Sequence, residues 1–391
     1  MIGALLSARS LRAFADGYVA VLLPVYLIAL GFGTLEVGFL STVTMLGSAA
    51  ATLAVGRWGH RFELRRLLIA AAALMVATGV GFAAFSSLWP LLVVALAGTM
   101  NPGGGDVSVF YPLEHTALAA ATPAETRTSA FARYSFIGSL FGAVGALAAA
   151  APEWLAGRHG MTMLDGLKLM FVLYGVIGFI VGLLYMRFPR TDHAEKAPAP
   201  LGPSKATVWK LAGLFSVDAF AGGLMVNSLM TLWLLQRFGL TLSQAGVFFF
   251  WTGLLSAVSQ LAAPAVARRF GLLNTMVFTH IPANVCLVLA ALAPNLPTAL
   301  VLLSVRSALS QMDVPTRSAY VMAVVTPPER PAAASFTAVP RSLAAALSPA
   351  LSGALLAGGW LAAPLVACGA LKIAYDLVLW RLCRRDTLGD E

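Results

Sequence analysis

Long apolar stretches, each about the length needed to cross a lipid bilayer, recur along the whole chain and constrain its fold more than any other feature. A transmembrane helix needs about 20 predominantly apolar residues, and loop-forming residues divide the sequence into about twelve such stretches. Charged residues are only 11% of the chain, far fewer than soluble domains carry. The sequence therefore predicts an all-α integral membrane protein with twelve transmembrane helices.

A polar linker separates these spans into two groups of six. Residues 188–206, "FPRTDHAEKAPAPLGPSKA", are rich in proline and charge, as flexible linkers are. We therefore predict an N-terminal six-helix bundle over 1–187 and a C-terminal six-helix bundle over 207–391. The twelve predicted spans are 11–32, 36–56, 66–86, 88–121, 127–151, 165–187, 207–236, 243–267, 272–293, 297–325, 332–357 and 360–383.

The distribution of Lys and Arg predicts how the chain is oriented, because cytoplasmic loops collect these residues. Eighteen of the 26, Arg9 and Arg12 among them, fall at one set of span ends, three at the other, and five inside the spans. We therefore expect both termini in the cytoplasm and a multi-pass protein of the bacterial inner membrane. The net charge of +9 reflects this topology, and we expect no nucleic-acid partner. The first span is expected to be retained, since no cleavage site follows it.

The two halves repeat one another at a constant offset of 208 residues. The pairs in register are Gly31 with Gly239, Gly38 with Gly246, Arg61 with Arg269, Arg133 with Arg341, and Gly145 with Gly353. Close to this register, "DVSV" at 106 matches "DVPT" at 313. Because each half has an even number of spans, the repeats point the same way, as in transporters whose halves are related by an axis along the membrane normal.

The loop between the second and third spans, "GRWGHRFELRR" at 56–66, has a weaker echo in "ARRFGLL" at 267–273. It resembles the signature loop of the major facilitator superfamily, with His60 where that family usually has an acid. The resemblance covers essentially the whole chain, and "DVPTR…AYVMAVV" is similar to segments of bacterial members. It implies two bundles related by a parallel pseudo-two-fold axis and a monomeric secondary transporter similar to drug and metabolite proton antiporters. It also implies a gating loop made of Gly56, His60, Arg61, Arg65 and Arg66.

The fourth predicted span contains "NPGGGDVSVFYPLEH" at 101–115, which is unusual for a membrane helix. Pro102 removes a backbone donor, and the glycines at 103–105 tolerate conformations that other residues cannot adopt. We therefore predict a broken or bent helix that faces protein or a water-filled cavity. Asp106 lies near the middle of this span and Asp313 near the middle of the tenth. Either aspartate is a candidate proton site or a helix N-cap.

Three further acids are candidate proton-coupling residues, since burial raises the pKa of a carboxyl group. Glu114 lies eight residues after Asp106, and with His115 it is either a proton relay or a solvated pair at the end of the helix. Asp16 and Asp218 lie in the first spans of the two halves, where each either binds a proton or reaches to the interface.

Five arginines and lysines fall inside predicted spans. Arg133 and Arg341, at equivalent places in the two halves, either clamp an anionic group or neutralise buried acids. Arg306, Asp313 and Arg317 share a face if their helix is continuous. Lys372 and Asp376, four residues apart, are predicted to form a local pair. The remaining candidate polar contacts to a substrate are Asn227, Tyr134 and Tyr320, and the alternative role for each is a hydrogen bond between helices.

These features favour a proton-coupled secondary active transporter that exports a small organic solute, anionic or amphipathic, by rocking of the two halves. Two transport alternatives remain: proton-coupled uptake by a symporter, and a divalent-metal carrier using Asp106, Glu114, His115 and Asp313. The sequence contains no HExxH, GxSxG or GxxxxGK[ST] motif, so we expect neither an enzyme, nor a cofactor, nor a resident metal. A membrane-embedded scaffold is the third alternative. The expected partners are the substrate, protons and lipid.

Overall fold

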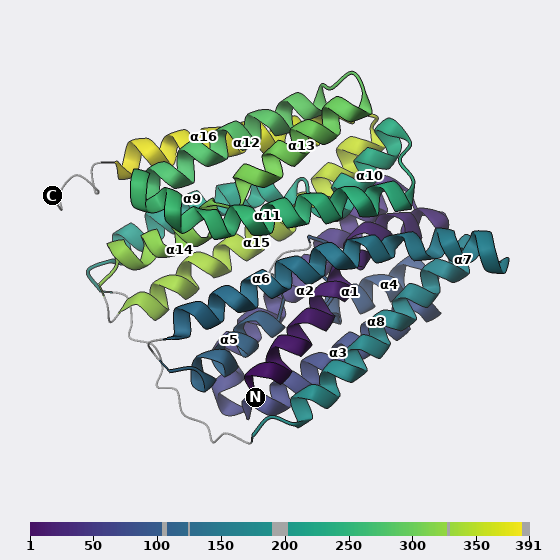
Figure 1. The fold of residues 1–391 in the computed structure, drawn as a ribbon, viewed down its shortest axis with the longest axis horizontal. Helices are drawn as coiled ribbons and strands as arrows, with labels where there is room; N and C mark the ends of the chain where they lie inside the picture. The colour runs from purple at the N-terminus through teal and green to yellow at the C-terminus, as the bar shows by residue number, and fades with distance from the viewer. Residues whose placement is uncertain (104–107, 124–125, 190–201, 327–328, 385–391) are drawn as a thin grey trace. The chain divides into compact units, whose positions relative to one another are not determined.

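The computed structural model consists of helices joined by short loops (Figure 1). It describes residues 1–103, 108–123, 126–189, 202–326 and 329–384. Contacts divide the chain into two compact units. Unit 1 contains Met1–Glu195 and Val226–Phe250, and unit 2 contains Lys196–Met225 and Trp251–Glu391. The predicted all-α fold class is confirmed.

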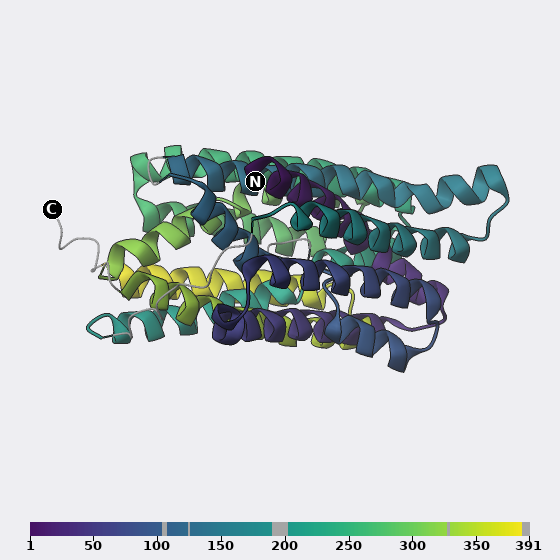
Figure 2. The same cartoon turned by 90° about the horizontal axis from the view of Figure 1, so that it is seen from below.

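Figures 1 and 2 show the helices of the two units from two directions. Unit 1 contains α1 (Ile2–Ala29), α2 (Thr34–Trp58), the 3-10 turn η1 (Gly59–Arg61), α3 (Leu64–Ala84), α4 (Leu88–Ala97), α5 (Phe110–Ala121), α6 (Arg127–Leu147), the 3-10 turn η3 (Ala148–Ala150), α7 (Ala151–His159), α8 (Met163–Met186) and α10 (Asn227–Phe238). Unit 2 contains α9 (Lys205–Gly223), α12 (Leu272–Ala291), α13 (Leu296–Ser310), α14 (Asp313–Val324), α15 (Arg330–Ala357) and α16 (Ala363–Cys383). Helix α11 (Leu242–Phe270) contributes to both units.

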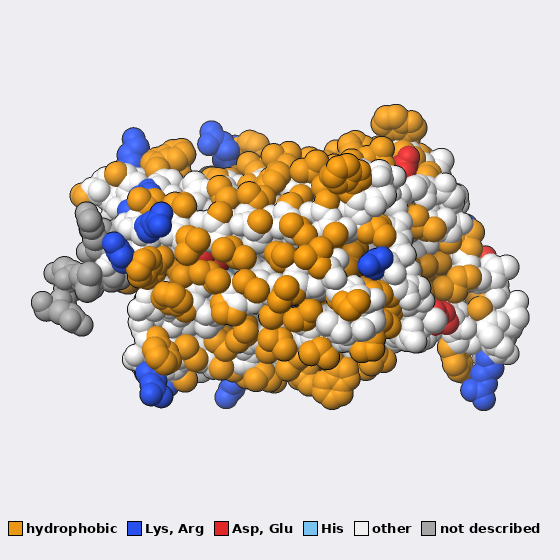
Figure 3. All heavy atoms as spheres, turned by 90° about the horizontal axis from the view of Figure 1, so that it is seen from above, with side chains coloured by type: hydrophobic (Ala, Val, Ile, Leu, Met, Phe, Trp, Pro, Cys, Tyr) orange, Lys and Arg blue, Asp and Glu red, His pale blue; other side chains and the backbone are white. Residues whose placement is uncertain are grey.

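Ten helical segments in the described part of the chain are long and apolar enough to cross a membrane. The two pairs of shorter helices, α4 with α5 and α13 with α14, fill the places of the fourth and tenth predicted spans. The prediction of twelve spans is therefore confirmed. Hydrophobic side chains are spread over the whole face shown in Figure 3. The exposed hydrophobic residues of the described chain include Trp89, Val93 and Phe179. Such a surface is suited to contact with lipid.

The fourth span is interrupted, as its proline and glycines predicted. Helix α4 ends at Ala97 and α5 begins only at Phe110. The described backbone between them finds partners: the Gly103 N–H donates to the Asn101 side chain at 3.0 Å, and the Pro102 carbonyl accepts from the Ser228 N–H at 3.1 Å. These bonds satisfy groups that a continuous helix would have paired. Asp106 lies outside the described residues.

The tenth span is interrupted by a shorter break, between Ser310 and Asp313. Asp313 is the first residue of α14, and the N-cap position belongs to Met312, which makes no side-chain cap bond. The alternative that Asp313 caps the resumed helix is therefore wrong. Its carboxylate binds Arg317 instead, at 2.8 Å.

In unit 1, α1 and α6 pack with their backbones in direct contact. A Cβ atom added to Gly145 would lie 2.0 Å from the Phe14 carbonyl oxygen, and one added to Gly17 would lie 2.1 Å from the Gly142 carbonyl oxygen. Both distances are far inside van der Waals contact, so these glycines are required for the approach. The glycines of "GSLFGAVG" at 138–145 therefore allow α6 to pack closely against α1.

We expect Gly145→Ala to destabilise unit 1 by about 1–3 kcal/mol or more, because the added methyl group meets backbone that must move as a helix. The control is Gly213→Ala in α9, where an added Cβ has nothing within 4 Å. Melting in detergent measures both variants. Equal melting temperatures for Gly145→Ala and the wild type would contradict this packing.

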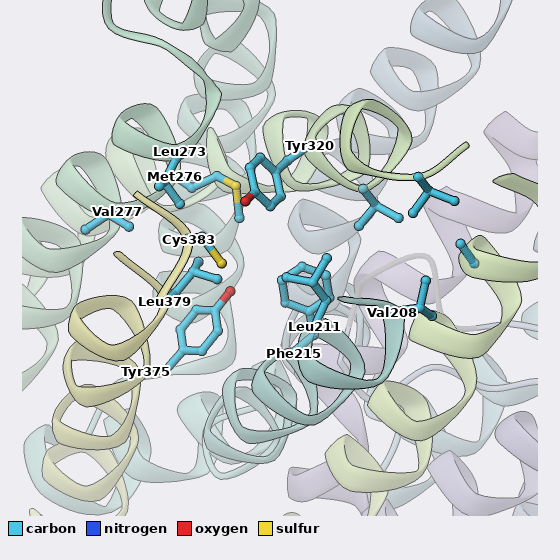
Figure 4. Close-up of a cluster of buried hydrophobic side chains, with 13 residues drawn as sticks. Val208, Leu211, Phe215, Leu273, Met276, Val277, Tyr320, Tyr375, Leu379 and Cys383 are labelled. Carbon is cyan, nitrogen blue, oxygen red and sulfur yellow. The ribbon is translucent and has the colours of Figure 1, made fainter. Parts of the chain in front are cut away.

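In unit 2, apolar side chains from α9, α12, α14, α15 and α16 form one buried cluster (Figure 4). Phe215 of α9, Met276 of α12, Tyr320 of α14 and Tyr375 of α16 are among its largest members. Because the side chains of this cluster come from five helices, the apolar surface that they bury together fixes the positions of these helices relative to one another. It lies beside the charged residues described below, since the Arg317 guanidinium carbon is 5.7 Å from the centre of the Phe215 ring.

Glu329, immediately before α15, holds the end of the polar linker. Its carboxylate accepts from the backbone N–H groups of Gly202 at 2.5 Å and Ser204 at 3.1 Å. The Ser204 hydroxyl first, and then these N–H groups, lower the pKa of Glu329 below its ordinary value. Because the pKa of Glu329 is lower in the folded protein, its contact contributes fully to folding stability at any pH above the ordinary pKa of glutamate. This contribution is lost as the pH falls through the lowered pKa.

We therefore expect Glu329→Gln to release the linker end and to speed trypsin cleavage after Lys205 several-fold. In the wild type, we expect the ratio of the cleavage rate after Lys205 to the cleavage rate after Lys196 to stay constant between about pH 6 and 8. The reason is that this whole range lies well above the pKa of glutamate. Peptide mapping by mass spectrometry gives both rates. An unchanged ratio in Glu329→Gln would show that this carboxylate does not hold the linker.

Candidate functional site

Unit 1 contains a buried ion pair between α1 and α5 that two tyrosines complete. The Arg12 guanidinium donates to the Glu114 carboxylate, and the Tyr134 hydroxyl donates to the same oxygen. The Tyr185 hydroxyl donates to the other oxygen at 2.5 Å. Arg12 is 2% exposed and Glu114 0%. A buried charge needs such partners, and we call these four residues the N-terminal charge cluster.

Aromatic and charged neighbours surround this cluster. The Arg12 guanidinium carbon lies 4.0 Å from the centre of the Phe110 ring, and that of Arg9 lies 4.9 Å from the centre of the Tyr134 ring. These are cation–π distances. Asp16, half-buried one turn along α1 from Arg12, interacts electrostatically with Arg12 and Arg9. Both charges of the ion pair are therefore held by several partners.

Unit 2 contains a larger set of charges drawn from four helices. The Asp218 carboxylate of α9 accepts from Lys372 of α16 at 2.5 Å and from Arg317 of α14 at 3.2 Å. Arg317 also donates to Asp313 at 2.8 Å. Arg341 of α15 acts on Arg317, Asp218 and Asp313 electrostatically. We call these five residues, Asp218, Asp313, Arg317, Arg341 and Lys372, the C-terminal charge cluster.

Arg341 and Arg306 differ from Arg317, which binds two aspartates. Among the described residues, neither has a carboxylate within ion-pair distance, and the Nε atom of each is buried without a hydrogen-bond partner. The group that acts on Arg306 most is the thiol of Cys368. A cation at membrane depth without an acid partner is costly, so both are suited to an anionic ligand.

A histidine and an acid pair beside the C-terminal charge cluster. The Nδ1 atom of His280 in α12 lies 3.0 Å from each oxygen of Asp376 in α16. Both side chains are buried. The predicted local pair between Lys372 and Asp376 is wrong, because Lys372 binds Asp218 across helices and Asp376 binds His280.

The two clusters join equivalent helices with reversed charge. In the repeat, α1 corresponds to α9 and α5 to α14. The N-terminal pair has its cation on α1 and its acid on α5, whereas the C-terminal pair has its acid on α9 and its cation on α14. Either order neutralises buried charge between the same two helices.

The other predicted site residues lie in varied surroundings. Arg133 is exposed on α6. Asn227 is the first residue of α10 and half-buried, and Tyr320 lies in the apolar cluster of unit 2. His115 packs against Tyr111, with ring centroids 3.8 Å apart. Among the described residues, no three His, Cys, Asp or Glu side chains are grouped as a metal site requires.

The predicted gating loop is a short turn between α2 and α3. Residues Gly59–Arg61 form η1, and Glu63 precedes the first residue of α3. Arg66 pairs with Glu63 at 3.2 Å, and its side chain is 80% exposed. Arg61 is exposed and Arg65 half-buried, and a Cβ on Gly56 would meet nothing within 4 Å. The side chain of His60 lies outside the described residues.

Sequence reasoning missed Arg9, Arg12, Tyr185, Lys372 and Asp376 as site residues. Arg9 and Arg12 were assigned to the cytoplasmic end of a first span beginning at 11, but α1 begins at Ile2 and Arg12 is buried. Their three-residue spacing, which places both on one helix face, was the signal available. Tyr185 gave none, because tyrosine is common near the ends of membrane helices.

These helices and charge clusters can be compared with known proteins. The sequence matches the Major Facilitator Superfamily over residues 5–310 and again over 214–390. The chain belongs to the major facilitator superfamily. It is accordingly a multi-pass membrane protein and a secondary transporter, and the predicted family and fold are confirmed. Members of this family bind small molecules and are typically monomeric. The family is one of transporters rather than enzymes.

Individual relatives agree with this assignment. An uncharacterized membrane protein of Saccharomyces cerevisiae is 25% identical over 406 aligned positions, which cover 94% of this chain and 91% of the relative. A bacterial homologue of the human lysosomal transporter Spinster matches with a TM-score of 0.73 at 15% identity, over 100% of this chain and 97% of that one. The xylose transporter XylE from E. coli matches with a TM-score of 0.73 at 15% identity, over 97% and 96%. The structural matches show a shared fold.

Proposed function

We propose that this superfamily member couples protons to the transport of a small organic anion by alternating access of its two six-helix bundles. The observation that carries the proposal is Arg341, a cation of the C-terminal charge cluster without an acid partner among the described residues. Arg306 supports it in the same way. A carboxylate or phosphate group would supply the missing acid, and arginine binds such groups with two parallel hydrogen bonds.

The charge balance of the cluster supports a coupled proton. Asp218 and Asp313 carry two negative charges, while Arg317, Arg341 and Lys372 carry three positive charges. The cluster therefore has a net charge of +1, which one bound monoanion neutralises. Binding of an anion makes the site more negative, which favours the uptake of a proton nearby.

This balance bears on the direction of transport. The sequence favoured export, with uptake by a symporter as the alternative. A proton and an anion that bind one positively charged site strengthen each other's binding, because each offsets the charge the other brings. Linkage of this sign gives cotransport in the same direction, so we propose proton-coupled uptake. An exporter of the same anion would need a site that the proton and the anion cannot occupy at the same time.

The metal-carrier alternative is less favourable. Both carboxylate oxygens of Glu114, one of its four proposed ligands, already accept hydrogen bonds from Arg12, Tyr134 and Tyr185. A divalent ion at Glu114 would also lie beside the Arg12 cation, which repels it. Calorimetry with Mn²⁺ and Zn²⁺ at neutral pH separates the two functions, since the proposed anion carrier binds neither ion.

Proteoliposomes test the proposed function. We would first screen lactate, succinate, benzoate and glycerol 3-phosphate for thermal stabilisation of the purified protein, with xylose and tetraphenylphosphonium as uncharged and cationic controls. The best anion should then accumulate in vesicles that are alkaline inside. Loss of preloaded anion under the same gradient would indicate exchange and export. Uptake indifferent to the gradient would remove proton coupling from the proposal.

The proposal includes an orientation with both termini in the cytoplasm of a bacterial cell, based on the distribution of Lys and Arg. Gly3→Cys and Gly157→Cys, each made in a variant whose Cys286, Cys368 and Cys383 are replaced by alanine, would test it in whole cells. A membrane-impermeant thiol reagent should label the cysteine at 157 and spare the cysteine at 3. The opposite labelling pattern would invert the orientation.

A further inference from the structure

The His280–Asp376 pair is a buried titratable group that the proposed anion site does not use. His280 is 4% exposed and Asp376 1%, and Nδ1 lies 3.0 Å from both carboxylate oxygens. This geometry allows the imidazole to donate to the acid whether it is neutral or protonated. The pair is neutral overall when His280 is protonated and carries one negative charge when it is not.

Lys372 connects this pair to the C-terminal charge cluster. It lies four residues before Asp376 on α16, so both side chains leave the same face of the helix one turn apart. Lys372 donates to Asp218 at 2.5 Å. It therefore has two acids within reach, of which Asp218 is the one it binds here and Asp376 the one that His280 occupies.

The charged groups around the pair come from several helices. Asp218 of α9 and Lys372 of α16 act on Asp376 electrostatically, together with His280 of α12. Asp218 in turn is acted on by Lys372, His280, Arg317 of α14 and Arg341 of α15. Asp376 also acts on Tyr375, its neighbour in α16. Helix α13, which packs on α12, contributes Arg306. A change of charge at His280 is thus felt by the anion site.

We propose that His280 binds the coupling proton and that Lys372 transmits its charge to the anion site by exchanging Asp218 for Asp376. When His280 is protonated, Asp376 is neutralised and Lys372 stays on Asp218, which leaves Arg317 and Arg341 more positive. When His280 is neutral, the negative charge of Asp376 attracts Lys372 away from Asp218. Asp218 then pairs with Arg317 alone, so Arg317 offers less positive charge to the anion and the anion binds more weakly. This inference rests on the proposed function and adds the residue that carries the proton.

His280→Gln tests the proposal, because glutamine keeps a donor to Asp376 and cannot titrate. When one proton is coupled, a gradient of one pH unit supports about tenfold accumulation of the anion. We expect His280→Gln to lose this accumulation while it still exchanges external for internal anion without a gradient. Its anion affinity should no longer depend on the protonation of this side chain, because glutamine does not bind a proton. His159→Gln, at the end of α7, is the matched control and should behave like the wild type.

The outcomes separate this inference from the proposed function. A wild type that shows no gradient-driven accumulation refutes the proposed function itself. A coupled wild type together with fully coupled His280→Gln overturns only the role of His280. If that variant does not fold, Asp376→Asn tests the same exchange from the other side, with the same loss of coupling expected. If neither variant folds, NMR of the histidines in the wild type provides the test. Addition of the anion should change the signal of one imidazole in a pH-dependent way, and an unchanged set of signals would overturn the proposal.

Discussion

Replacing Arg12 with methionine is expected to destabilise the protein by about 3–5 kcal/mol, the cost of breaking a buried ion pair from one side. The change leaves Glu114, which is 0% exposed, without its cation in the interior of unit 1. The two tyrosine hydroxyls that remain do not neutralise its charge. Thermal melting of the purified protein in detergent, followed by fluorescence-detected gel filtration, measures the loss.

A second variant and a control make this expectation specific to the pair. Arg12→Met with Glu114→Gln removes both charges, so the double variant should recover a large part of the lost stability. Arg66→Met breaks the exposed pair with Glu63, and pairs of that kind are worth about 0–1 kcal/mol. If Arg12→Met melts like Arg66→Met, the ion pair does not hold unit 1 together.

Arg341→Gln is expected to abolish anion transport while leaving the protein folded. Among the described residues, Arg341 has no carboxylate at ion-pair distance, so its removal leaves no buried acid alone. Loss of one partner from a buried charge contact costs about 2 kcal/mol or more, which is roughly thirtyfold in affinity for the anion. Isothermal titration with the anion selected by thermal shift gives this affinity directly.

The matched variants for Arg341 distinguish its charge from its shape. Arg341→Lys keeps the charge without the planar two-donor geometry and should retain part of the affinity. Arg237→Gln removes an exposed arginine in the last turn of α10 and should change neither affinity nor melting. Wild-type affinity in Arg341→Gln would contradict the assignment of this residue to the anion site.

The sequence predicted the fold because the membrane restricts it so strongly. Apolar stretches of span length have few alternatives to helices in lipid, and the proline and glycines at 102–105 predicted the interruption between α4 and α5. The repeat at an offset of 208 could be detected because glycines at close helix contacts, such as Gly145, cannot be replaced by a larger side chain.

Partners within the charge clusters were harder to predict, because an ion pair across helices depends on rotation about each helix axis. The spacing of Lys372 and Asp376 favoured a local pair, yet each has a better partner on another helix. Arg12 was assigned to the cytoplasmic end of the first span, because loop and helix residues both tolerate arginine near a membrane surface. Glu114 was predicted to be a proton-relay residue or part of a solvated pair, and its tyrosine partners lie 20 and 71 residues away in sequence.

Proton movement that accompanies the anion tests the central claim most directly. Wild-type proteoliposomes in weak buffer, with no imposed gradient, would receive the selected anion outside while a pH electrode records the external solution. Cotransport predicts that the outside becomes alkaline as the anion enters, and that Arg341→Gln shows neither effect. Anion entry without a pH change, or with acidification outside, would contradict the account.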